Sequence, residues 1–144
     1  MSQAPTISVI EDDASVRAAT SRLLTSYGYV VHAFVSAGDF LLSPHVSDSA
    51  CLIVDVQMPG MSGIELQAHL RAHGHCVPII FVTAFPEDAI RARALKAGAA
   101  CFLSKPFEGP RLIQSVEKAL GRRTGHQSAL LAATLGTTSN AASP

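Results

Sequence analysis

The sequence predicts a doubly wound α/β fold, in which helices cover both faces of one parallel sheet. Short apolar runs alternate five times with longer segments whose apolar residues recur at helical spacing. The runs 52–54 and 79–82 are apolar without alternation, as is typical of central strands that are buried on both faces. Because a helical segment follows each run, the strands are expected to be parallel and their crossovers right-handed.

The bounds and order of the helices and strands follow from these patterns and from residues that typically cap helix ends. In the first helical segment, Val16, Ala19, Leu23 and Leu24 share one face. Serines at 36 and 62 are placed as N-caps, and glycines at 28, 74 and 98 as C-caps. The expected strands are Thr6–Ile10, Tyr29–Phe34, Cys51–Val54, Pro78–Val82 and Ala100–Leu103. The expected helices are Ala14–Tyr27, Ala37–Leu42, Ser62–His73, Glu87–Ala97 and Glu108–Leu120.

Composition excludes several classes of protein. Of 144 residues, 48% are hydrophobic and 15% charged, which argues against disorder. The formal net charge is zero, so a broad basic surface for direct nucleic-acid binding is not expected. No apolar run is long enough for a membrane helix, and the N-terminus lacks the pattern of a secretory signal. Three cysteines without a CxxC motif favour a reducing compartment, so we expect a cytoplasmic protein that does not contact membranes.

The C-terminal segment differs from the rest of the chain. Residues 124–144 contain no Asp, Glu, Lys or Arg, and we expect them to form a flexible tail after a single domain of residues 1–123. Too few residues follow Leu120 for a trihelical helix-turn-helix, and they lack the basic side chains that phosphate contacts need. No DNA-binding domain is therefore expected within this chain.

Polar residues gather where the expected strands end. Glu11 and Asp12 follow the first strand, Asp55 the third, Thr83 the fourth and Lys105 the fifth. In an open parallel sheet, the carboxyl ends of the strands form the binding crevice. Clustered carboxylates suit Mg²⁺, and a lysine and a hydroxyl beside it suit a phosphoryl group. Asp55, at the tip of a buried strand, would be the nucleophile. Asp13 fits this cluster and a helix cap equally well.

The segments that carry these residues resemble one family. They are Val9–Asp13, Val54–Gly63, Phe81–Ala84 and Phe102–Phe107. Together they are similar to the receiver domain of two-component response regulators, and more specifically to receivers of the nitrogen-fixation type that precede a LuxR-like domain. The similarity runs from Thr6 to Leu120. It implies a flavodoxin-like, CheY-like sheet of five strands in the order 2-1-3-4-5 with five helices.

The resemblance implies a magnesium site and a phosphoryl site. Asp12, Asp55 and the backbone carbonyl of Gln57 would ligate Mg²⁺, with Glu11 acting through a water molecule. Asp55 would accept the phosphoryl group from a sensor histidine kinase or a phosphotransfer protein. The phosphoryl oxygens would contact the Thr83 hydroxyl, the backbone N–H of Ala84 and the Lys105 ammonium group, and the Lys105–Pro106 bond would be cis. The protein would be a signalling switch and not an enzyme that turns over a substrate.

The resemblance also implies how the signal is transmitted and how long it lasts. Thr83 and Phe102 would form the switch pair that remodels the fourth helix, fifth strand and fifth helix. This face would bind a downstream protein or a second copy of the chain in a phosphorylation-dependent homodimer. Gln57 and Phe85 would flank the water that hydrolyses the phosphoryl group, and the apolar Phe85 ring predicts slow loss of the signal.

Four other interpretations each fit a part of the sequence. An aspartyl-phosphate phosphohydrolase needs an acid two residues after its nucleophile, where this chain has Gln57. A flavin- or nucleotide-binding domain needs a glycine-rich loop after the first strand, where acids stand instead. A constitutive pseudo-receiver scaffold would lack some of the required groups, which are all present. His69, His73, His75 and Cys76 could bind a soft metal or could be an ordinary surface cluster, and their role stays open.

Overall fold

The computed structural model describes residues 4–121 as a five-stranded parallel sheet in the order β2-β1-β3-β4-β5, with five helices. This confirms the predicted fold class. The strands are β1 (Thr6–Ile10), β2 (Val30–Phe34), β3 (Cys51–Asp55), β4 (Ile79–Thr83) and β5 (Cys101–Ser104). The helices are α1 (Ala14–Ser26), α2 (Ala37–Leu41), α3 (Gly63–Ala72), α4 (Asp88–Lys96) and α5 (Gly109–Ala119).

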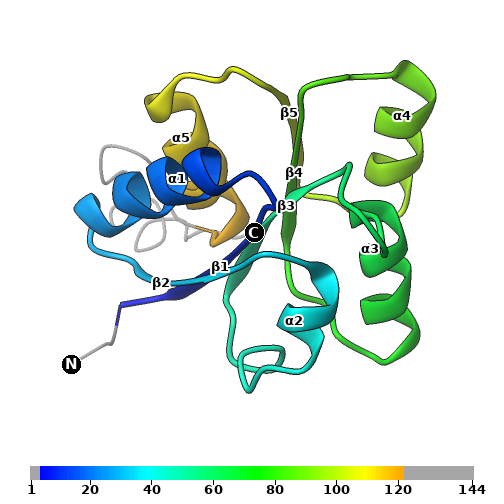
Figure 1. The fold of residues 1–144 in the computed structure, drawn as a ribbon, viewed down its shortest axis with the longest axis horizontal. Helices are drawn as coiled ribbons and strands as arrows, with labels where there is room; N and C mark the ends of the chain where they lie inside the picture. The colour runs from blue at the N-terminus through cyan, green and yellow to red at the C-terminus, as the bar shows by residue number, and fades with distance from the viewer. Residues whose placement is uncertain (1–3, 122–144) are drawn as a thin grey trace, which may run out of the picture.

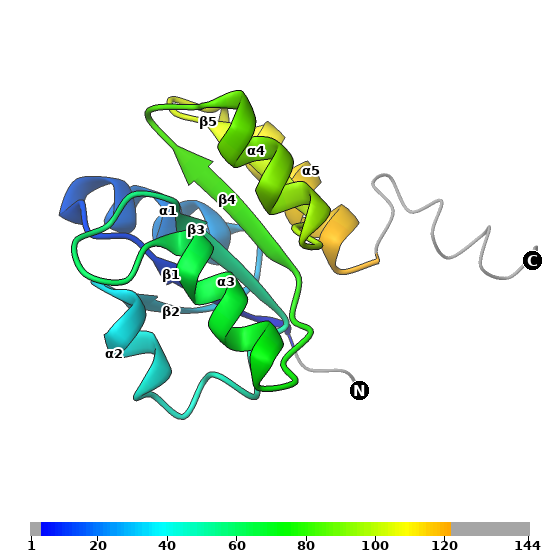
Figure 2. The same cartoon turned by 90° about the vertical axis from the view of Figure 1, so that its right-hand side faces the viewer.

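The helices lie in two layers on opposite faces of the sheet. Figure 1 shows α1 and α5 together on one face and α2, α3 and α4 on the other. Figure 2, turned by 90°, shows α3 running antiparallel to the strands it covers. The first four helices each return the chain to the start of the next strand, and all strands end at the same edge. The two-sided cover explains why β3 and β4 are buried along their whole length.

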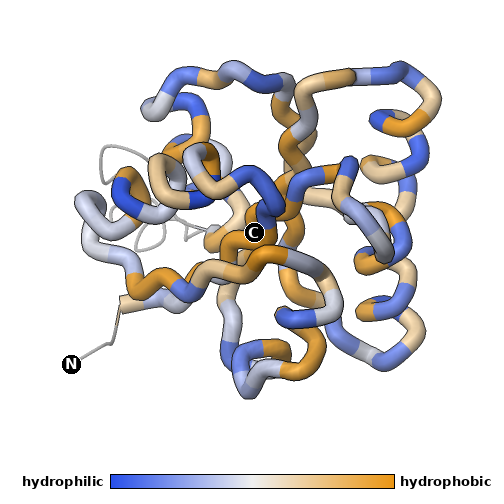
Figure 3. Tube along the Cα trace, viewed as in Figure 1, coloured by the Kyte–Doolittle hydropathy of each residue, from blue (hydrophilic) through white to orange (hydrophobic). Residues whose placement is uncertain are grey.

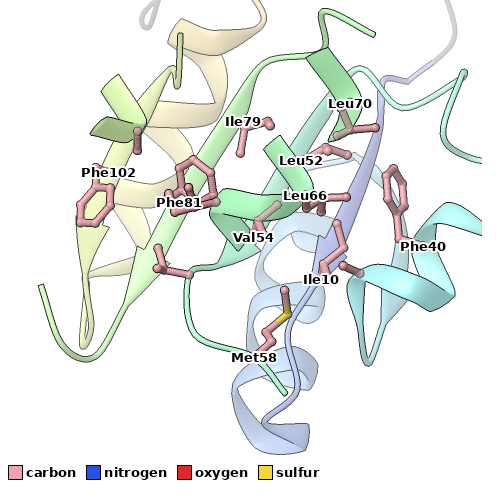
Figure 4. Packing of buried hydrophobic residues seen from close by; sticks show 14 residues of the cluster. Ile10, Phe40, Leu52, Val54, Met58, Leu66, Leu70, Ile79, Phe81 and Phe102 are labelled. Carbon is pink, nitrogen blue, oxygen red and sulfur yellow. The ribbon is translucent and has the colours of Figure 1, made fainter. Parts of the chain in front are cut away.

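Each face of the sheet has its own hydrophobic core. On the α2–α3–α4 face, Phe40, Leu66, Leu70 and Phe81 are fully buried with apolar residues of β1 and β3 (Figure 4). On the α1–α5 face, Leu24, Leu112 and Val116 and their neighbours form the second cluster. The hydropathy colours of Figure 3 show this pattern as orange strands between helices that alternate in colour.

Side-chain caps begin the first three helices. The Asp13 carboxylate accepts hydrogen bonds from the backbone N–H groups of Ser15 and Val16, which lowers the pKa of that carboxyl. Ser36 caps α2, and Ser62 forms a reciprocal capping box with Glu65 at the start of α3. The two predicted serine caps are confirmed, and Asp13 is engaged as a cap.

The helix ends also match the expectation. Gly28, Gly74 and Gly98 follow α1, α3 and α4 with positive φ, a conformation that glycine adopts without a steric penalty. All predicted strand and helix boundaries are correct to within one residue. The predicted tail, 124–144, and the last two residues of the predicted domain lie outside the described residues. Within residues 4–121, no helix is long and apolar enough to cross a membrane.

Candidate phosphoryl and metal site

The carboxyl edge of the sheet brings together the polar residues that the sequence singles out. Glu11 directly follows β1, Asp55 and Thr83 are the last residues of β3 and β4, and Lys105 directly follows β5. Glu11, Asp55 and Thr83 are almost completely buried residues, with 2%, 6% and 1% of their surface exposed. Asp12 is exposed beside them. Polar groups buried at the ends of central strands are costly unless they have partners.

Lys105 is the partner that joins two of the acids. Its Nζ donates to Glu11 Oε1 at 2.7 Å and to Asp55 Oδ2 at 3.3 Å. Burial of Lys105 opposes its charge, but the hydrogen bond to Glu11 and the charges of Asp55 and Glu11 together raise the pKa of Lys105 above its usual value. The ammonium group therefore stays charged. The Lys105–Pro106 peptide bond is cis, as predicted.

Glu11 is the most perturbed group of the site. Its burial raises the pKa of the carboxyl to about 7, and the nearby Asp55 acts in the same direction. The hydrogen bonds that Glu11 accepts from Lys105 and from the backbone N–H of Asp13 oppose this rise. Like charges held close together in a buried site disfavour ionisation of one of them. A divalent cation here would relieve that repulsion.

The residues present fit a magnesium ion. Glu11, Asp12 and Asp55 each place one carboxylate oxygen within 4.8 Å of the others. All three residues offer carboxylate oxygens, and Asp12 is exposed, so the cluster is accessible to solvent on its side. Mg²⁺ prefers oxygen ligands and keeps several waters, so a half-open cluster of carboxylates suits it. When bound, the ion would neutralise charge on a transferring phosphoryl group.

Backbone groups orient the two side chains that would meet the phosphoryl group. The N–H of Gln57 donates to Asp55 Oδ1 at 3.1 Å, so each Asp55 oxygen has a hydrogen-bond partner. The N–H of Phe85 donates to Thr83 Oγ1 at 3.1 Å. These contacts hold both side chains at the edge without using an additional side chain. Ala84, between Thr83 and Phe85, is exposed at the same edge beside Lys105.

Two supporting residues were not identified from the sequence. Arg17 of α1 turns back and donates to the backbone carbonyls of Glu11 at 2.9 Å and Asp12 at 3.4 Å, so it fixes the loop that carries both acids. Gly63 begins α3 directly against the end of β3, where a Cβ would lie 2.6 Å from the Asp55 carbonyl oxygen. Neither the hydrogen bonds of Arg17 nor the close packing at Gly63 produces a periodic pattern in the sequence. Only the sequence proximity of Arg17 to the acids could have suggested its position.

The remaining predicted residues lie around this centre. Phe102 is on β5 with 8% of its surface exposed, and its ring centroid is 6.3 Å from that of Phe81. Phe85 is 68% exposed and lines an open groove together with Gln57. His69 and His73 lie on the last turns of α3, away from the acids. Among residues 4–121, the only group of three or more possible metal-ligating side chains is the acid cluster.

A doubly wound sheet with an acid cluster, a threonine and a lysine at its carboxyl edge defines the receiver class of signalling domains. The chain belongs to the response regulator receiver domain family, whose sequence model matches residues 7–117.

Individual relatives agree with this assignment. The chain is 40% identical over 114 residues to Nodulation protein W of Bradyrhizobium diazoefficiens, covering 79% of this chain and 50% of that protein. It is 40% identical over 116 residues to the transcriptional regulatory protein FixJ of Azorhizobium caulinodans, covering 81% and 55%. The structure of the response regulator StyR superposes with a TM-score of 0.76 at 44% identity, covering 82% of this chain and 60% of that one. The predicted similarity to nitrogen-fixation receivers is confirmed. The chain spans about half the length of the curated relatives it matches.

Proposed function

We propose that this protein is a phosphoacceptor switch that takes a phosphoryl group onto Asp55 with the help of Mg²⁺. The observation that carries the proposal is the Lys105 ammonium group, which contacts both Asp55 and Glu11 at the carboxyl edge of the sheet. A lysine held between two buried acids supplies the charge that phosphoryl oxygens need. The sensor histidine kinase, or a phosphotransfer protein, is the proposed donor.

The transfer uses groups that the fold already holds in place. An oxygen of the Asp55 carboxylate attacks phosphorus, the new O–P bond forms, and the N–P bond to the donor imidazole breaks with its electron pair staying on nitrogen. Lys105 can leave Asp55 for a phosphoryl oxygen without leaving Glu11. The Thr83 hydroxyl and the Ala84 N–H would contact the other oxygens. Water that enters later hydrolyses the acyl phosphate, so the protein acts only on its own phosphoryl group and is not an enzyme with a separate substrate.

The test of this function is uptake from a small phosphodonor. Purified protein incubated with acetyl phosphate and Mg²⁺ should gain one phosphoryl group, and removal of Mg²⁺ with a chelator should prevent the gain. Reduction with borohydride followed by peptide mass spectrometry should place the group on Asp55. Failure to take up the group, or its location on another residue, would contradict the proposal.

Phe85 is proposed to slow the loss of the signal. Its exposed side chain lines one groove together with Gln57, which supports an approach of the attacking water between these two side chains. Gln57 can hydrogen-bond that water but cannot take its proton at neutral pH. Phe85→Ala and Phe85→Glu are expected to speed the decay of the phosphoprotein several-fold, which is about 1 kcal/mol in barrier. Leu42→Ala removes an exposed apolar side chain directly after α2, away from the site, and should leave the decay unchanged. Equal decay in wild type and both Phe85 variants would exclude this role.

The α4–β5–α5 face is the proposed output surface. Thr83 moving toward a phosphoryl group would change the packing around Phe102, which is already turned inward. Beside Phe102, a hollow between α4 and α5 is lined by Asp88, Arg91 and other residues of both signs, including Glu108 and Arg111. A surface with both charges can pair with itself in a two-fold dimer, and a downstream protein is the other proposed occupant.

Dimerisation through this face is tested by light scattering. Beryllium fluoride with Mg²⁺ should shift wild type toward a dimer, and Arg91→Glu should weaken the shift. Arg22→Glu is the control, because it makes the same charge reversal at an exposed position of α1, outside the face. A shift that Arg91→Glu leaves unchanged would point to another surface.

The proposed setting is the cytoplasm. Cys51, Cys76 and Cys101 are all free thiols, which fits a reducing compartment. Burial raises the pKa of the Cys51 thiol to about 12, so that residue is held as an inert part of the core.

A further inference from the structure

Two histidines share one face at the end of α3. His69 and His73 are four residues apart, the spacing that puts side chains above one another on a helix. Their rings lie face to face, with centroids 4.2 Å apart and an angle of 25° between the planes. His69 is half-buried and His73 is exposed, so both rings are reachable from solvent. Neither residue belongs to the phosphoryl site.

A hydrogen bond fixes the tautomer of one ring. His73 Nδ1 lies 2.8 Å from the backbone carbonyl oxygen of His69. A carbonyl oxygen can only accept, so Nδ1 carries the hydrogen, and in the neutral ring Nε2 keeps its lone pair. This is the arrangement in metal-binding histidines, where a backbone carbonyl or a carboxylate holds one ring nitrogen and the metal binds the other.

The local charges favour a cation. The C-terminal turn of a helix carries the negative end of its dipole, and His69 and His73 stand at that turn of α3. Arg71, the nearest basic side chain in the same turn, is directed away and donates to the carbonyl of Gly98 at 3.2 Å. Its guanidinium group is therefore engaged on the α4 side of the helix.

We propose that His69 and His73 together bind one divalent transition ion of the Zn²⁺, Cu²⁺ or Ni²⁺ class. Imidazole nitrogens suit these ions, whereas Mg²⁺ prefers oxygen. Side chains four residues apart on a helix can reach one ion, and a Zn–N bond is about 2.0–2.1 Å long. The two rings would turn out of their stacked arrangement, so that both Nε2 lone pairs point at the ion. Water molecules would complete the coordination shell.

The proposed site is separate from the magnesium cluster. α3 begins beside the end of β3 and runs antiparallel to the strands, so its last turn lies at the opposite edge of the sheet (Figure 2). The two sites also differ in donor type, oxygen at one and nitrogen at the other. The protein could therefore hold both ions at once, and a bound transition ion would link the last two turns of α3.

Calorimetric titration with Zn²⁺ in an excess of Mg²⁺ tests the site in the full chain. Wild type should bind Zn²⁺, and His69→Gln and His73→Gln should each lower the affinity at least about tenfold, because the second ligand binds at high effective concentration only when the first is in place. His75→Gln, beside the same turn, is the matched control and should retain wild-type affinity.

Hydrogen exchange gives a second readout that reports the location. Ion binding should slow amide exchange in the last turn of α3, by about a hundredfold when free Zn²⁺ is one hundred times the dissociation constant. The slowing should disappear in His69→Gln and in His73→Gln. No binding by wild type, wild-type affinity in either His69→Gln or His73→Gln, or an equal loss of affinity in His75→Gln would overturn the proposal.

Discussion

Asp55→Asn is expected to abolish phosphoryl uptake, lowering its rate by at least about a thousandfold, or about 4 kcal/mol in barrier. An amide oxygen is a far weaker nucleophile than a carboxylate, and it cannot form the acyl phosphate. The substitution also removes the charge that contacts Lys105 Nζ at 3.3 Å and one of the three metal-ligating carboxylates. Labelling with acetyl phosphate and binding of beryllium fluoride, both with Mg²⁺, measure the loss.

The same variant should keep its fold, so that the loss can be assigned to chemistry. The amide oxygen can still accept from the N–H of Gln57, and Lys105 keeps its 2.7 Å contact with Glu11. We expect its free energy of unfolding to lie within about 1 kcal/mol of wild type, because the lost contact with Lys105 is offset by the lost repulsion between the Asp55 and Glu11 carboxylates. Asp39→Asn makes the same chemical change on α2 and should take up phosphoryl normally. Labelling of Asp55→Asn at the wild-type level would exclude Asp55 as the acceptor.

The fold could be predicted because its signals are local. Apolar runs, helical spacing, serine caps and C-cap glycines each depend on a few consecutive residues, and all pointed to one sheet. The errors have physical causes. The prediction began the second strand at Tyr29, but the Tyr29 N–H bonds to the Leu24 carbonyl and so closes α1. The third and fourth strands were ended one residue early because Asp55 and Thr83 are polar, although both still pair with their neighbouring strands.

The site could be predicted only in part, since its contacts join distant segments. The expectation that polar residues at the carboxyl ends of parallel strands meet located the acids and Lys105. Of these, Glu11 and Lys105 are in contact although they are 94 residues apart in the sequence. This expectation could not show that Lys105 binds Glu11 more closely than Asp55, because that depends on side-chain positions. It also missed Arg17, whose side chain turns back from α1 to hold the acidic loop. A helix pattern indicates which face a residue occupies but not what a long polar side chain reaches.

Gly63 is the residue whose replacement should test most directly how the fold supports the site. Its backbone N–H donates to the Val56 carbonyl at 2.9 Å, which holds the start of α3 against the end of β3. A Cβ at Gly63 would lie 2.6 Å from the Asp55 carbonyl oxygen, 3.0 Å from Val56 Cα and 3.1 Å from a ring carbon of Phe81. Two of these neighbours are backbone atoms, so no side-chain rotation can relieve the contact.

Gly63→Ala is therefore expected to move α3 away from β3 and to destabilise the protein by about 1–3 kcal/mol, the usual cost of overpacking. Because the displaced backbone carries Asp55, phosphoryl uptake should fall as well. Gly38→Ala is the matched control: its Cβ would meet only Ser36 Oγ at 3.8 Å, and alanine in a helix is favoured over glycine by up to about 1 kcal/mol. Urea unfolding should thus show a lower free energy of unfolding for Gly63→Ala and an unchanged or higher one for Gly38→Ala. Wild-type stability and uptake in Gly63→Ala would show that the contact between α3 and β3 is looser than this geometry requires.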